Sequence, residues 1–575
     1  MFLLRRFLRD YKKQLVIGPL CKLFEAVLEL FVPLVMAAVI DNGILKGDSG
    51  YVLGMGAVLV ALGAVGLASA LVCQYMASYT SQGAGTKIRE ALFKHIGSLS
   101  HRELDEIGTP SLITRMTGDI NAVQANIAMT MRLLLRAPFL IIGALVMACF
   151  INLEISLIFF GASLMIGVIL YLVMTRSMPY YRDIQSEVDR ISLLSRENLS
   201  GNRVIRAFSK QKAQQKSVEN ETEKLARIST RVGRLSALLN PATYMVTYLA
   251  VALILYFGGL KVNGGVLLSG DIVALTSYMT QILLAMIVLA NLVVLLSRGS
   301  ACARRVNEVL LTKPTVIENS DKEIKTDPTA PKVEFRGVSF SYGDGDNELE
   351  NISFKIGKNT FTGIIGTTGS GKSTLLSLIL RYYDVPSGEV LADGVNVKDY
   401  PFSQLRGKIG VVPQKSVLFS GTVRSNMRWQ KADADDEEIM RALKIAQADG
   451  FIKELPAGLD APVAQGGTNF SGGQRQRLCI ARALVGDPEL IILDDSFSAL
   501  DFATEKALRN ALSELKNTTL IVVTQRCSTV MKADKILVLE DGRIEGEGTH
   551  DELFETCPAY REICLSQFKS EEAAR

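Results

Sequence analysis

The sequence predicts an N-terminal all-α polytopic membrane domain followed by a C-terminal α/β domain that carries a P-loop. Three observations support this fold class. Of the 575 residues, 48% are hydrophobic and only 21% are charged. Long apolar runs fill the chain before about residue 310, whereas the sequence after about residue 330 is charged like a soluble domain. A glycine-rich motif of the form GxxxxGK[ST] lies in this second part.

The membrane domain is expected to have six spanning helices within residues 1–311. A helix needs about 20 apolar residues to cross the roughly 30 Å hydrocarbon core of a bilayer. Six stretches meet this requirement, at 15–40, 52–79, 130–152, 155–176, 240–262 and 271–297.

The distribution of basic residues predicts which ends of these helices face the cytoplasm. The first span follows a cluster of five basic residues, namely Arg5, Arg6, Arg9, Lys12 and Lys13. The turns after spans 1, 3 and 5 carry one Lys and no Arg, whereas the segments 80–129 and 177–239 are rich in both. The positive-inside rule therefore predicts a multi-pass protein of the cytoplasmic (inner) membrane with both termini in the cytoplasm.

The two long cytoplasmic segments, 80–129 and 177–239, have helical periodicity of their own. We expect helical hairpins that extend beyond the membrane, with tips near Gly108–Ser111 and Gly201–Phe208. The alternative is a solvated loop, but structureless loops of this length are uncommon.

Charged and Met side chains inside the spans are candidates for a substrate pathway. Charge in a bilayer is costly and normally faces a polar cavity or a partner charge. The alternatives are an internal salt-bridge cluster for the charges and simple packing for the methionines. The candidates are Glu25, Glu29, Arg132, Arg136, Met279 and Met286.

Charge and cysteine content exclude several functions. The net charge of +4 comes from 63 basic and 59 acidic residues, which is too balanced to indicate nucleic-acid binding. The eight cysteines show no CxxC pair, so we expect neither a disulfide framework nor a zinc site. The three histidines show no metal-ligand spacing.

A polar, Pro-containing linker at 312–332 precedes the second domain at 333–575. There, an apolar strand at Phe361–Ile365 leads into the glycine-rich loop, and a helical stretch follows. Glycines allow backbone amides to surround phosphate oxygens at a helix N-terminus. Lys372 is expected to reach the β- and γ-phosphates of ATP, and Ser373 to ligate Mg²⁺. The predicted loop comprises Gly366, Thr367, Thr368, Gly369, Ser370, Gly371, Lys372, Ser373 and Thr374.

Two further motifs indicate which protein family this domain resembles. The buried run at 490–494 ends in Asp494, the expected second Mg²⁺ ligand. The segment Phe470–Arg477, with sequence FSGGQRQR, resembles the signature of ATP-binding cassette (ABC) transporters. The resemblance covers the whole chain, because six spans followed by one cassette is the order of an ABC exporter half-transporter.

The resemblance implies roles for further residues. Tyr342 occupies the position of the adenine-stacking aromatic residue, and Gln414 that of the glutamine loop, which contacts Mg²⁺ and the membrane domain. Two cassettes of the family dimerise head to tail, so that the signature of one chain completes the ATP site of the other. The residues implied for the partner's site are Ser471, Gly472, Gly473 and Gln474, with Asp501 in the D-loop.

Two residues depart from the family's pattern. The catalytic Glu is replaced by Asp495, and the switch His by Gln525. Asp is one methylene shorter than Glu, and catalysis is intolerant of displacements of about 1 Å. Gln cannot carry the positive charge of an imidazole. The pair therefore resembles the degenerate half of a heterodimeric bacterial multidrug-type exporter.

The sequence thus predicts one subunit of an ATP-driven exporter for amphipathic or hydrophobic substrates, partnered by a similar but non-identical chain. Membrane lipid and a small-molecule or peptide substrate are the other expected partners. The alternatives are a homodimeric exporter with slow hydrolysis, an exporter-fold importer of a metal chelate, and an ATP-gated channel.

Overall fold

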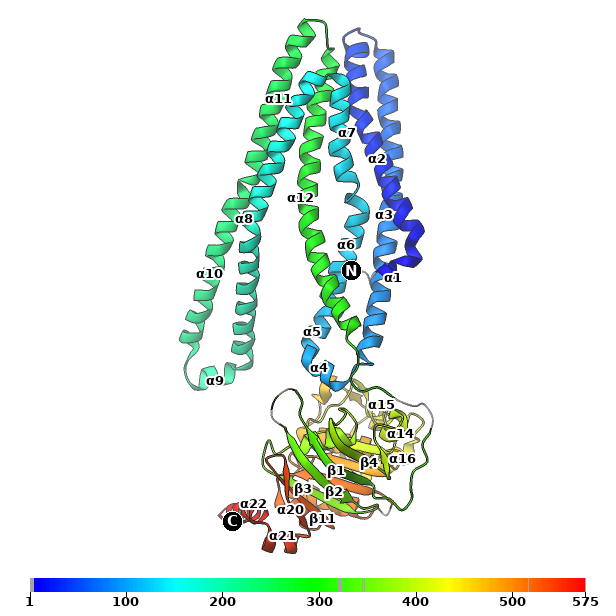
Figure 1. The fold of residues 1–575 in the computed structure, drawn as a ribbon, viewed down its shortest axis with the longest axis vertical. Coiled ribbons are helices and arrows are strands. Elements are labelled where there is room, and N and C mark those ends of the chain that lie inside the picture. The colour runs from blue at the N-terminus through cyan, green and yellow to red at the C-terminus, as the bar shows by residue number, and fades with distance from the viewer. Residues whose placement is uncertain (1–4, 319–322, 344, 346, 516, 574–575) are drawn as a thin grey trace. The chain divides into compact units, whose positions relative to one another are not determined.

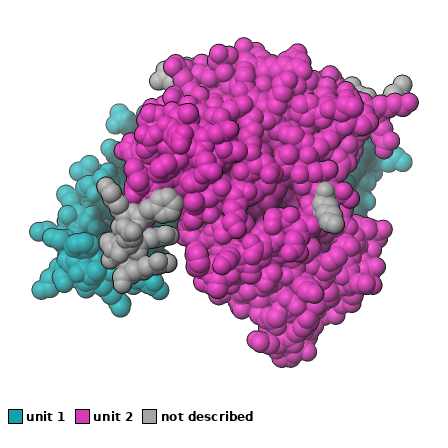
Figure 2. All heavy atoms as spheres, turned by 90° about the horizontal axis from the view of Figure 1, so that it is seen from below, with its two compact units in different colours: residues 1–97, 109–311 teal, residues 98–108, 312–575 magenta. Residues whose placement is uncertain are grey.

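The protein is described by a computed structural model that covers residues 5–318, 323–343, 345, 347–515 and 517–573 (Figure 1). The chain divides into two units, shown in separate colours in Figure 2. Unit 1 comprises residues 1–97 and 109–311, and unit 2 comprises residues 98–108 and 312–575. Four positions of the expected linker, 319–322, lie outside the described residues.

Unit 1 is built from long helices, as its apolar runs predict. In chain order these are α1 (Arg5–Leu8), η1 (Arg9–Tyr11), α2 (Lys12–Ala38), η2 (Val39–Ile44), α3 (Ser49–Ile96), α5 (Thr109–Thr114), η3 (Arg115–Asp119), α6 (Ile120–Leu133), α7 (Arg136–Ile151), α8 (Leu153–Ser200), α9 (Asn202–Ala207), α10 (Gln211–Ala237), α11 (Leu239–Asn263) and α12 (Ser269–Leu311).

Six helical stretches of the described chain are long and apolar enough to cross a membrane, in agreement with the predicted number. They are Arg6–Ile44, Ser49–Ile96, Thr109–Ile151, Leu153–Ser200, Gln211–Asn263 and Ser269–Leu311. Most of them extend well beyond the apolar runs, because the polar segments that precede or follow those runs are also helical. The third stretch is interrupted between α6 and α7, where Pro138 lies in the first turn of α7 and has no N–H to donate.

Helix α12 is the centre of unit 1. It packs against α2, α6, α7 and α11, and α8 runs beside α10 and α11 (Figure 1). Tyr278 of α12 is fully buried, and its hydroxyl donates a 2.7 Å hydrogen bond to the carbonyl oxygen of Leu30. Asp41 accepts a 2.8 Å hydrogen bond from the backbone N–H of Gly270. These contacts fix the N-terminal helix against the last one.

Unit 2 contains three sheets. The largest has the strand order β12-β11-β3-β10-β9-β6, in which only β12 is antiparallel to its neighbour. An antiparallel sheet has the order β2-β1-β4-β5, and β7 pairs with β8. The strands are β1 (Val333–Phe340), β2 (Leu349–Ile356), β3 (Phe361–Gly366), β4 (Ser387–Ala392), β5 (Val395–Asn396), β6 (Ile409–Val412), β7 (Gly421–Thr422), β8 (Pro462–Val463), β9 (Leu490–Asp494), β10 (Thr519–Thr524), β11 (Lys535–Glu540) and β12 (Arg543–Gly548).

Helices cover the six-stranded sheet, and in the described residues its strands contribute to three hydrophobic clusters. The helices of unit 2 are α4 (His101–Ile107), α13 (Lys372–Ile379), α14 (Phe402–Gly407), α15 (Val423–Met427), α16 (Asp436–Ile445), α17 (Asp449–Glu454), η4 (Gly458–Asp460), η5 (Gln465–Gly467), α18 (Gly472–Leu484), α19 (Phe502–Ser513), α20 (Cys527–Val530), α21 (His550–Thr556) and α22 (Pro558–Ala573).

The cysteine content contradicts one expectation. Cys527 and Cys564 form a disulfide, although the sequence predicted none. The pair is separated by 37 residues and becomes adjacent only when α22 packs beside α20. The spacing of the two cysteines in the sequence does not predict this contact, because the contact depends on tertiary packing.

Candidate nucleotide site

The glycine-rich loop joins β3 to α13, as expected from the strand and helix that flank it. Gly369 and Gly371 have φ angles of +87° and +94°, a conformation that residues with a side chain rarely adopt. A Cβ on Gly371 would lie only 2.9 Å from the carbonyl oxygen of Glu348. Glycine is therefore needed here for both the turn and the close approach.

Lys372, the first residue of α13, points its ammonium group back into this loop. Its Nζ donates hydrogen bonds to the carbonyl oxygen of Gly366 (3.0 Å), to Ser370 Oγ (3.1 Å) and to the carbonyl oxygen of Thr367. Burial lowers the pKa of Lys372, because it disfavours the charged form, and the nearby carboxylates of Asp494 and Asp495 oppose this shift. Because the hydrogen-bond partners of Lys372 are neutral, the positive charge remains available for a phosphate group.

The metal-ligating candidates meet next to this lysine. Strands β3, β10 and β9 are neighbours in the parallel sheet, so their carboxyl ends share one edge. Asp494 ends β9, and its Oδ2 accepts a 3.0 Å hydrogen bond from Ser373 Oγ. Burial raises the pKa of Asp494, and the neighbouring carboxylate of Asp495 raises it further. A carboxylate, a hydroxyl and the amide oxygen of Gln414 are the hard oxygen donors that Mg²⁺ prefers, so these residues fit that ion.

Most of the predicted loop and Mg²⁺-ligating residues line one cavity of about 250 Å³, whereas Gly366, Thr367 and Ser370 are not part of its lining. Its lining includes Thr368, Gly369, Gly371, Lys372, Ser373, Thr374, Gln414, Asp494, Asp495 and Gln525. Sequence reasoning missed three other lining residues, Glu348, Val523 and Thr524. The sequence could have indicated Thr524, because this residue ends the apolar run of β10 directly before Gln525. No sequence pattern indicated Glu348, because only the fold brings the start of β2 to the loop.

The two residues that depart from the ABC pattern both face this cavity. Asp495 follows β9 with φ of +46°, and its backbone N–H donates a 2.8 Å hydrogen bond to the carbonyl oxygen of Val523. Burial raises the pKa of Asp495. Gln525 follows the end of β10 and is exposed at the cavity wall. The site therefore holds a short carboxylate and a neutral amide beside the phosphate loop.

Tyr342 stands near the same loop. Its hydroxyl donates a 3.1 Å hydrogen bond to Thr374 Oγ1, and its ring packs edge-on against Tyr383 at 5.0 Å between centroids. The side chain keeps 40% of its surface exposed, enough to present a ring face to a base.

The signature residues lie elsewhere in unit 2. Ser471 caps the N-terminus of α18, where its Oγ accepts a 3.3 Å hydrogen bond from the N–H of Gln474. Asp501 caps α19, and the N–H of Thr504 lowers the pKa of its carboxylate. Among the described residues that line the phosphate cavity, none belongs to the signature Ser471–Gln474. Ser471 and Gly472 are instead exposed.

Helix α4 packs against the α/β domain within unit 2. Tyr383 donates a 2.6 Å hydrogen bond to Asp105 Oδ2, and the ring of His101 lies 4.2 Å from that of Tyr382. Since Tyr383 also contacts Tyr342, two aromatic rings connect this helix with the edge of the nucleotide site.

Three of the four charged candidates of the spans, Glu25, Glu29 and Arg136, form ion pairs in the structure. Glu25 binds Lys22 at 2.6 Å and Glu29 binds Arg136 at 2.7 Å, while Arg132 donates a 3.1 Å hydrogen bond to Ser78 Oγ. The second pair lines a cavity of about 140 Å³ together with Leu133, Ala137, Leu140, Gln281, Leu284, Ala285 and Val288. Met279 is fully buried in the helix core, and Met286 packs against that core. Neither methionine lines this cavity.

The fold and site define a membrane protein with an ATP-binding domain of the P-loop class. Family models agree: "ABC transporter transmembrane region" matches residues 15–286 and "ABC transporter" matches residues 349–498. The chain is 37% identical to an uncharacterised ABC transporter ATP-binding protein of Mycobacterium tuberculosis, covering 98% of each chain. It is 30% identical to the ATP-dependent lipid A-core flippase of Pectobacterium atrosepticum, covering 97% of this chain and 96% of the flippase.

The chain therefore belongs to the ABC transporter family, and its second domain is the ATPase domain of that family. A solved bacterial Atm1-family ABC exporter with ATP bound superposes with a TM-score of 0.78 at 23% identity, covering 98% of both chains. The fold is thus that of an exporter-type half-transporter, as the sequence predicted.

Proposed function

We propose that this chain is one subunit of an ATP-driven exporter and that its own ATP site is degenerate. The observation that carries the proposal is the lining of the phosphate cavity. Lys372, Ser373 and Asp494 line it and offer groups suited to phosphate and Mg²⁺. Asp495 and Gln525 also line it, at the positions where the family's pattern has a catalytic Glu and a switch His. The site therefore keeps its binding groups while both of its hydrolytic groups are weakened.

The chemistry of the two substituted residues supports slow hydrolysis. A shorter carboxylate at Asp495 stands further from an attacking water, and misplacement by about 1 Å costs about 100-fold in rate. The amide of Gln525 donates a hydrogen bond to the γ-phosphate but brings no positive charge. ATP bound here would stay long enough to hold two cassettes together.

A second chain is needed to complete the site. Because Ser471 and Gly473 do not line their own phosphate cavity, we infer that they act on the ATP bound by a partner. Helix α9 in unit 1 leaves Val204 and Phe208 exposed by 60% and 72%, and it buries none of its residues. These apolar side chains suit a contact with the partner's cassette. Since a hydrolytic site must exist somewhere in the complex, we propose a non-identical partner.

The membrane cavity suits an amphipathic substrate. It combines the Glu29–Arg136 pair with Gln281 and apolar walls, so both polar and apolar parts of a substrate find matching groups. The similarity to a lipid A-core flippase supports lipids as one such class. Glu29→Gln is expected to lower transport in vesicles, with Glu25→Gln as the matched control, because Glu25 pairs locally and does not line the cavity. Equal transport by both variants would argue against the pathway.

We also propose the placement of the parts. Residues 1–311 form the membrane domain, 312–332 the linker and 333–575 the nucleotide-binding domain, in the cytoplasmic (inner) membrane with both termini in the cytoplasm. The basic residues of the two long segments support this orientation.

The ATP turnover of the purified chain tests the proposal. We expect the chain alone to turn over ATP no faster than its Lys372→Met variant, and the complex from the natural host to be clearly faster. If the chain alone shows steady turnover that Lys372→Met removes, a slow homodimeric exporter is correct instead. Vesicles of known orientation distinguish export from import of a metal chelate, and currents without accumulation would indicate a channel.

A further inference from the structure

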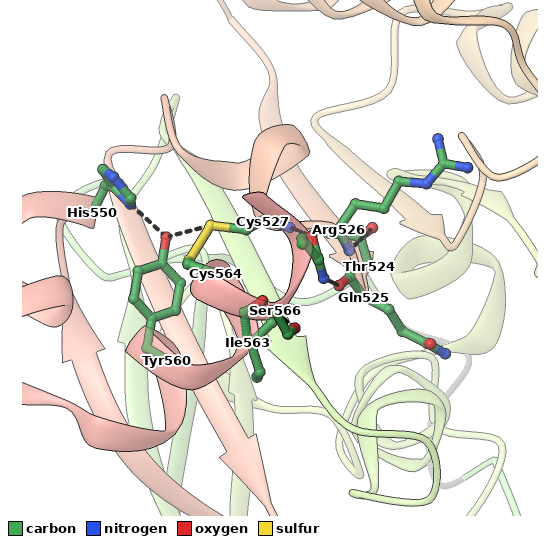
Figure 3. Close-up of a disulfide and its surroundings, with 10 residues drawn as sticks. Thr524, Gln525, Arg526, Cys527, His550, Tyr560, Ile563, Cys564 and Ser566 are labelled. Atoms are coloured by element: carbon green, nitrogen blue, oxygen red, sulfur yellow. Dashed lines mark hydrogen bonds between the residues drawn. A yellow bond between two sulfur atoms is a disulfide. The ribbon is translucent and has the colours of Figure 1, made fainter. Parts of the chain in front are cut away.

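The disulfide Cys527–Cys564 lies beside residues 524–526 (Figure 3), and Thr524 and Gln525 line the phosphate cavity. Cys527 begins α20 two residues after Gln525, and Cys564 belongs to α22. Both sulfur-bearing side chains are fully buried. The other six cysteines are free, and all of them lie in the described part of the chain. This pair is thus the one covalent link between α22 and the segment that carries Gln525.

Hydrogen bonds attach α22 to the same segment. The side-chain amide of Gln567 donates a 2.6 Å hydrogen bond to the carbonyl oxygen of Gln525. Its Oε1 accepts a 2.8 Å hydrogen bond from the N–H of Cys527. Helix α22 therefore holds residues 525–527 through the disulfide and the two hydrogen bonds of Gln567, and Gln525 lines the phosphate cavity.

Buried groups surround the two sulfur atoms and restrict the approach of a reagent. The Tyr560 hydroxyl lies 3.5 Å from Cys527 Sγ and 2.7 Å from His550 Nδ1. Tyr560 is fully buried, and burial raises the pKa of its hydroxyl to about 12. His550 is only half-buried and forms the solvent edge of the cluster. A reagent must reach the sulfurs past this edge, after local opening.

We propose that Cys527 and Cys564 form a redox-responsive site that controls how firmly Gln525 is held at the phosphate cavity. The inference rests on the proposed function in taking this cavity to bind ATP and this domain to lie in the cytoplasm. Disulfides in cytoplasmic proteins are usually transient and redox-sensing rather than structural, because that compartment keeps thiols reduced. The oxidant is a low-molecular-weight disulfide of the glutathione class.

The reaction balances by thiol–disulfide exchange. One cysteine thiolate attacks the small disulfide, forms a mixed disulfide and expels one small thiolate, which takes up a proton. The second cysteine loses its proton, attacks the mixed disulfide and expels the other small thiol. Two protein thiols are oxidised to the Cys527–Cys564 bond, and one small disulfide is reduced to two thiols.

Oxidation is expected to change nucleotide binding because the disulfide limits the conformational freedom of the segment 525–527. In the oxidised chain the segment is restrained before ATP arrives, so less conformational entropy is lost on binding. In the reduced chain the covalent restraint is gone, while the Gln567 hydrogen bonds and the hydrophobic packing of α20 against α22 remain. We therefore expect nucleotide to leave the oxidised chain more slowly, by about fivefold, the lower end of the usual coupling between two sites of a protein.

The experiment uses the full chain in lipid nanodiscs, equilibrated in glutathione buffers of graded redox ratio. Free thiols are alkylated, and mass spectrometry without reduction quantifies the peptide linked through Cys527 and Cys564. Release of a fluorescent ATP analogue is measured at each ratio. The linked fraction and the slower release are expected to rise together and to reverse on reduction. Cys564→Ala and Cys527→Ala abolish the response, whereas Cys557→Ala, a free buried cysteine of the same hydrophobic cluster, retains it.

Three results would overturn the inference. The first is the absence of the linked peptide at every ratio, and the second is equal release from oxidised and reduced chains. The third is one zinc ion per reduced chain that Cys564→Ala removes, since the two sulfurs and His550 lie close enough to share a metal. A chain that binds no nucleotide at any ratio would instead contradict the proposed function.

Discussion

The proposed function predicts that placing the family's Glu and His at positions 495 and 525 makes this chain's ATP site hydrolyse ATP efficiently. The change is Asp495→Glu with Gln525→His, made in a chain that also carries Ser471→Arg. Ser471 is exposed, and an arginine there is expected to block the signature motif of this chain. The partner's ATP site needs that motif, so it is expected to hydrolyse no ATP. The chain's own site then uses the partner's signature and is the only one left to hydrolyse ATP.

The expected magnitude follows from the geometry. Asp495 and Gln525 already line the phosphate cavity, so the exchange alters reach and charge while the loop stays in place. One added carbon–carbon bond moves the carboxylate by about 1.5 Å, and an error of about 1 Å costs about 100-fold. We therefore expect turnover in the Ser471→Arg background to rise by about 100-fold, within the range of about 10² to 10⁴ typical of general bases.

The assay is phosphate release by the complex in nanodiscs, beside the complex with Ser471→Arg alone. Loss of the Ser471 cap costs about 1 kcal/mol, and thermal unfolding checks that the chain stays folded. Asp495 has φ of +46°, which Asp tolerates better than Glu, so a slightly lower unfolding temperature is expected. A turnover that stays flat with and without Ser471→Arg would refute the reasoning. A rise that Ser471→Arg abolishes would indicate a homodimer, because both signatures would then be blocked.

Three further predictions concern binding and coupling. Lys372→Met removes a charged donor worth about 1.5–3 kcal/mol, so ATP affinity measured by fluorescence titration should fall by about 10- to 100-fold, and unchanged affinity would contradict the assigned role. Burial raises the pKa of Asp494, so its carboxylate takes up a proton at a higher pH than a free Asp and Mg²⁺-dependent ATP binding should weaken as the pH is lowered. That weakening should disappear in Asp494→Asn, and its persistence there would point to another group. Asp105→Ala removes the acceptor of the Tyr383 hydroxyl, so transport should fall while ATP binding is retained. Asp105→Asn keeps an acceptor and is the control, and equal transport by both variants would exclude coupling through this bond.

The nucleotide site could be predicted from the sequence because its determinants are local. The loop from Gly366 to Thr374 needs a strand before it and a helix after it, and both are visible as apolar runs. Asp494 ends another such run. Parallel strands bring these ends together, so the pairing of Ser373 with Asp494 follows from topology.

The remaining features depend on tertiary packing. Glu348 reaches the cavity only because β2 starts beside the loop. Cys527 and Cys564 meet only when α22 packs against α20. Helices α3 and α8 continue well past the predicted spans, since a change from apolar to polar side chains marks the bilayer boundary but does not end a helix. The pairing of Glu29 with Arg136 likewise joins two helices whose contact the sequence did not show.

Native mass spectrometry of the tagged chain, gently extracted from the membrane of its natural host, tests the central claim most directly. The account predicts a complex of one copy of this chain with one copy of a different chain of similar size. The partner should carry the hydrolytic residues that Asp495 and Gln525 replace here. A complex of two identical chains would contradict the heterodimer, and Asp495 would then have to act as a slow catalytic residue in two equal sites.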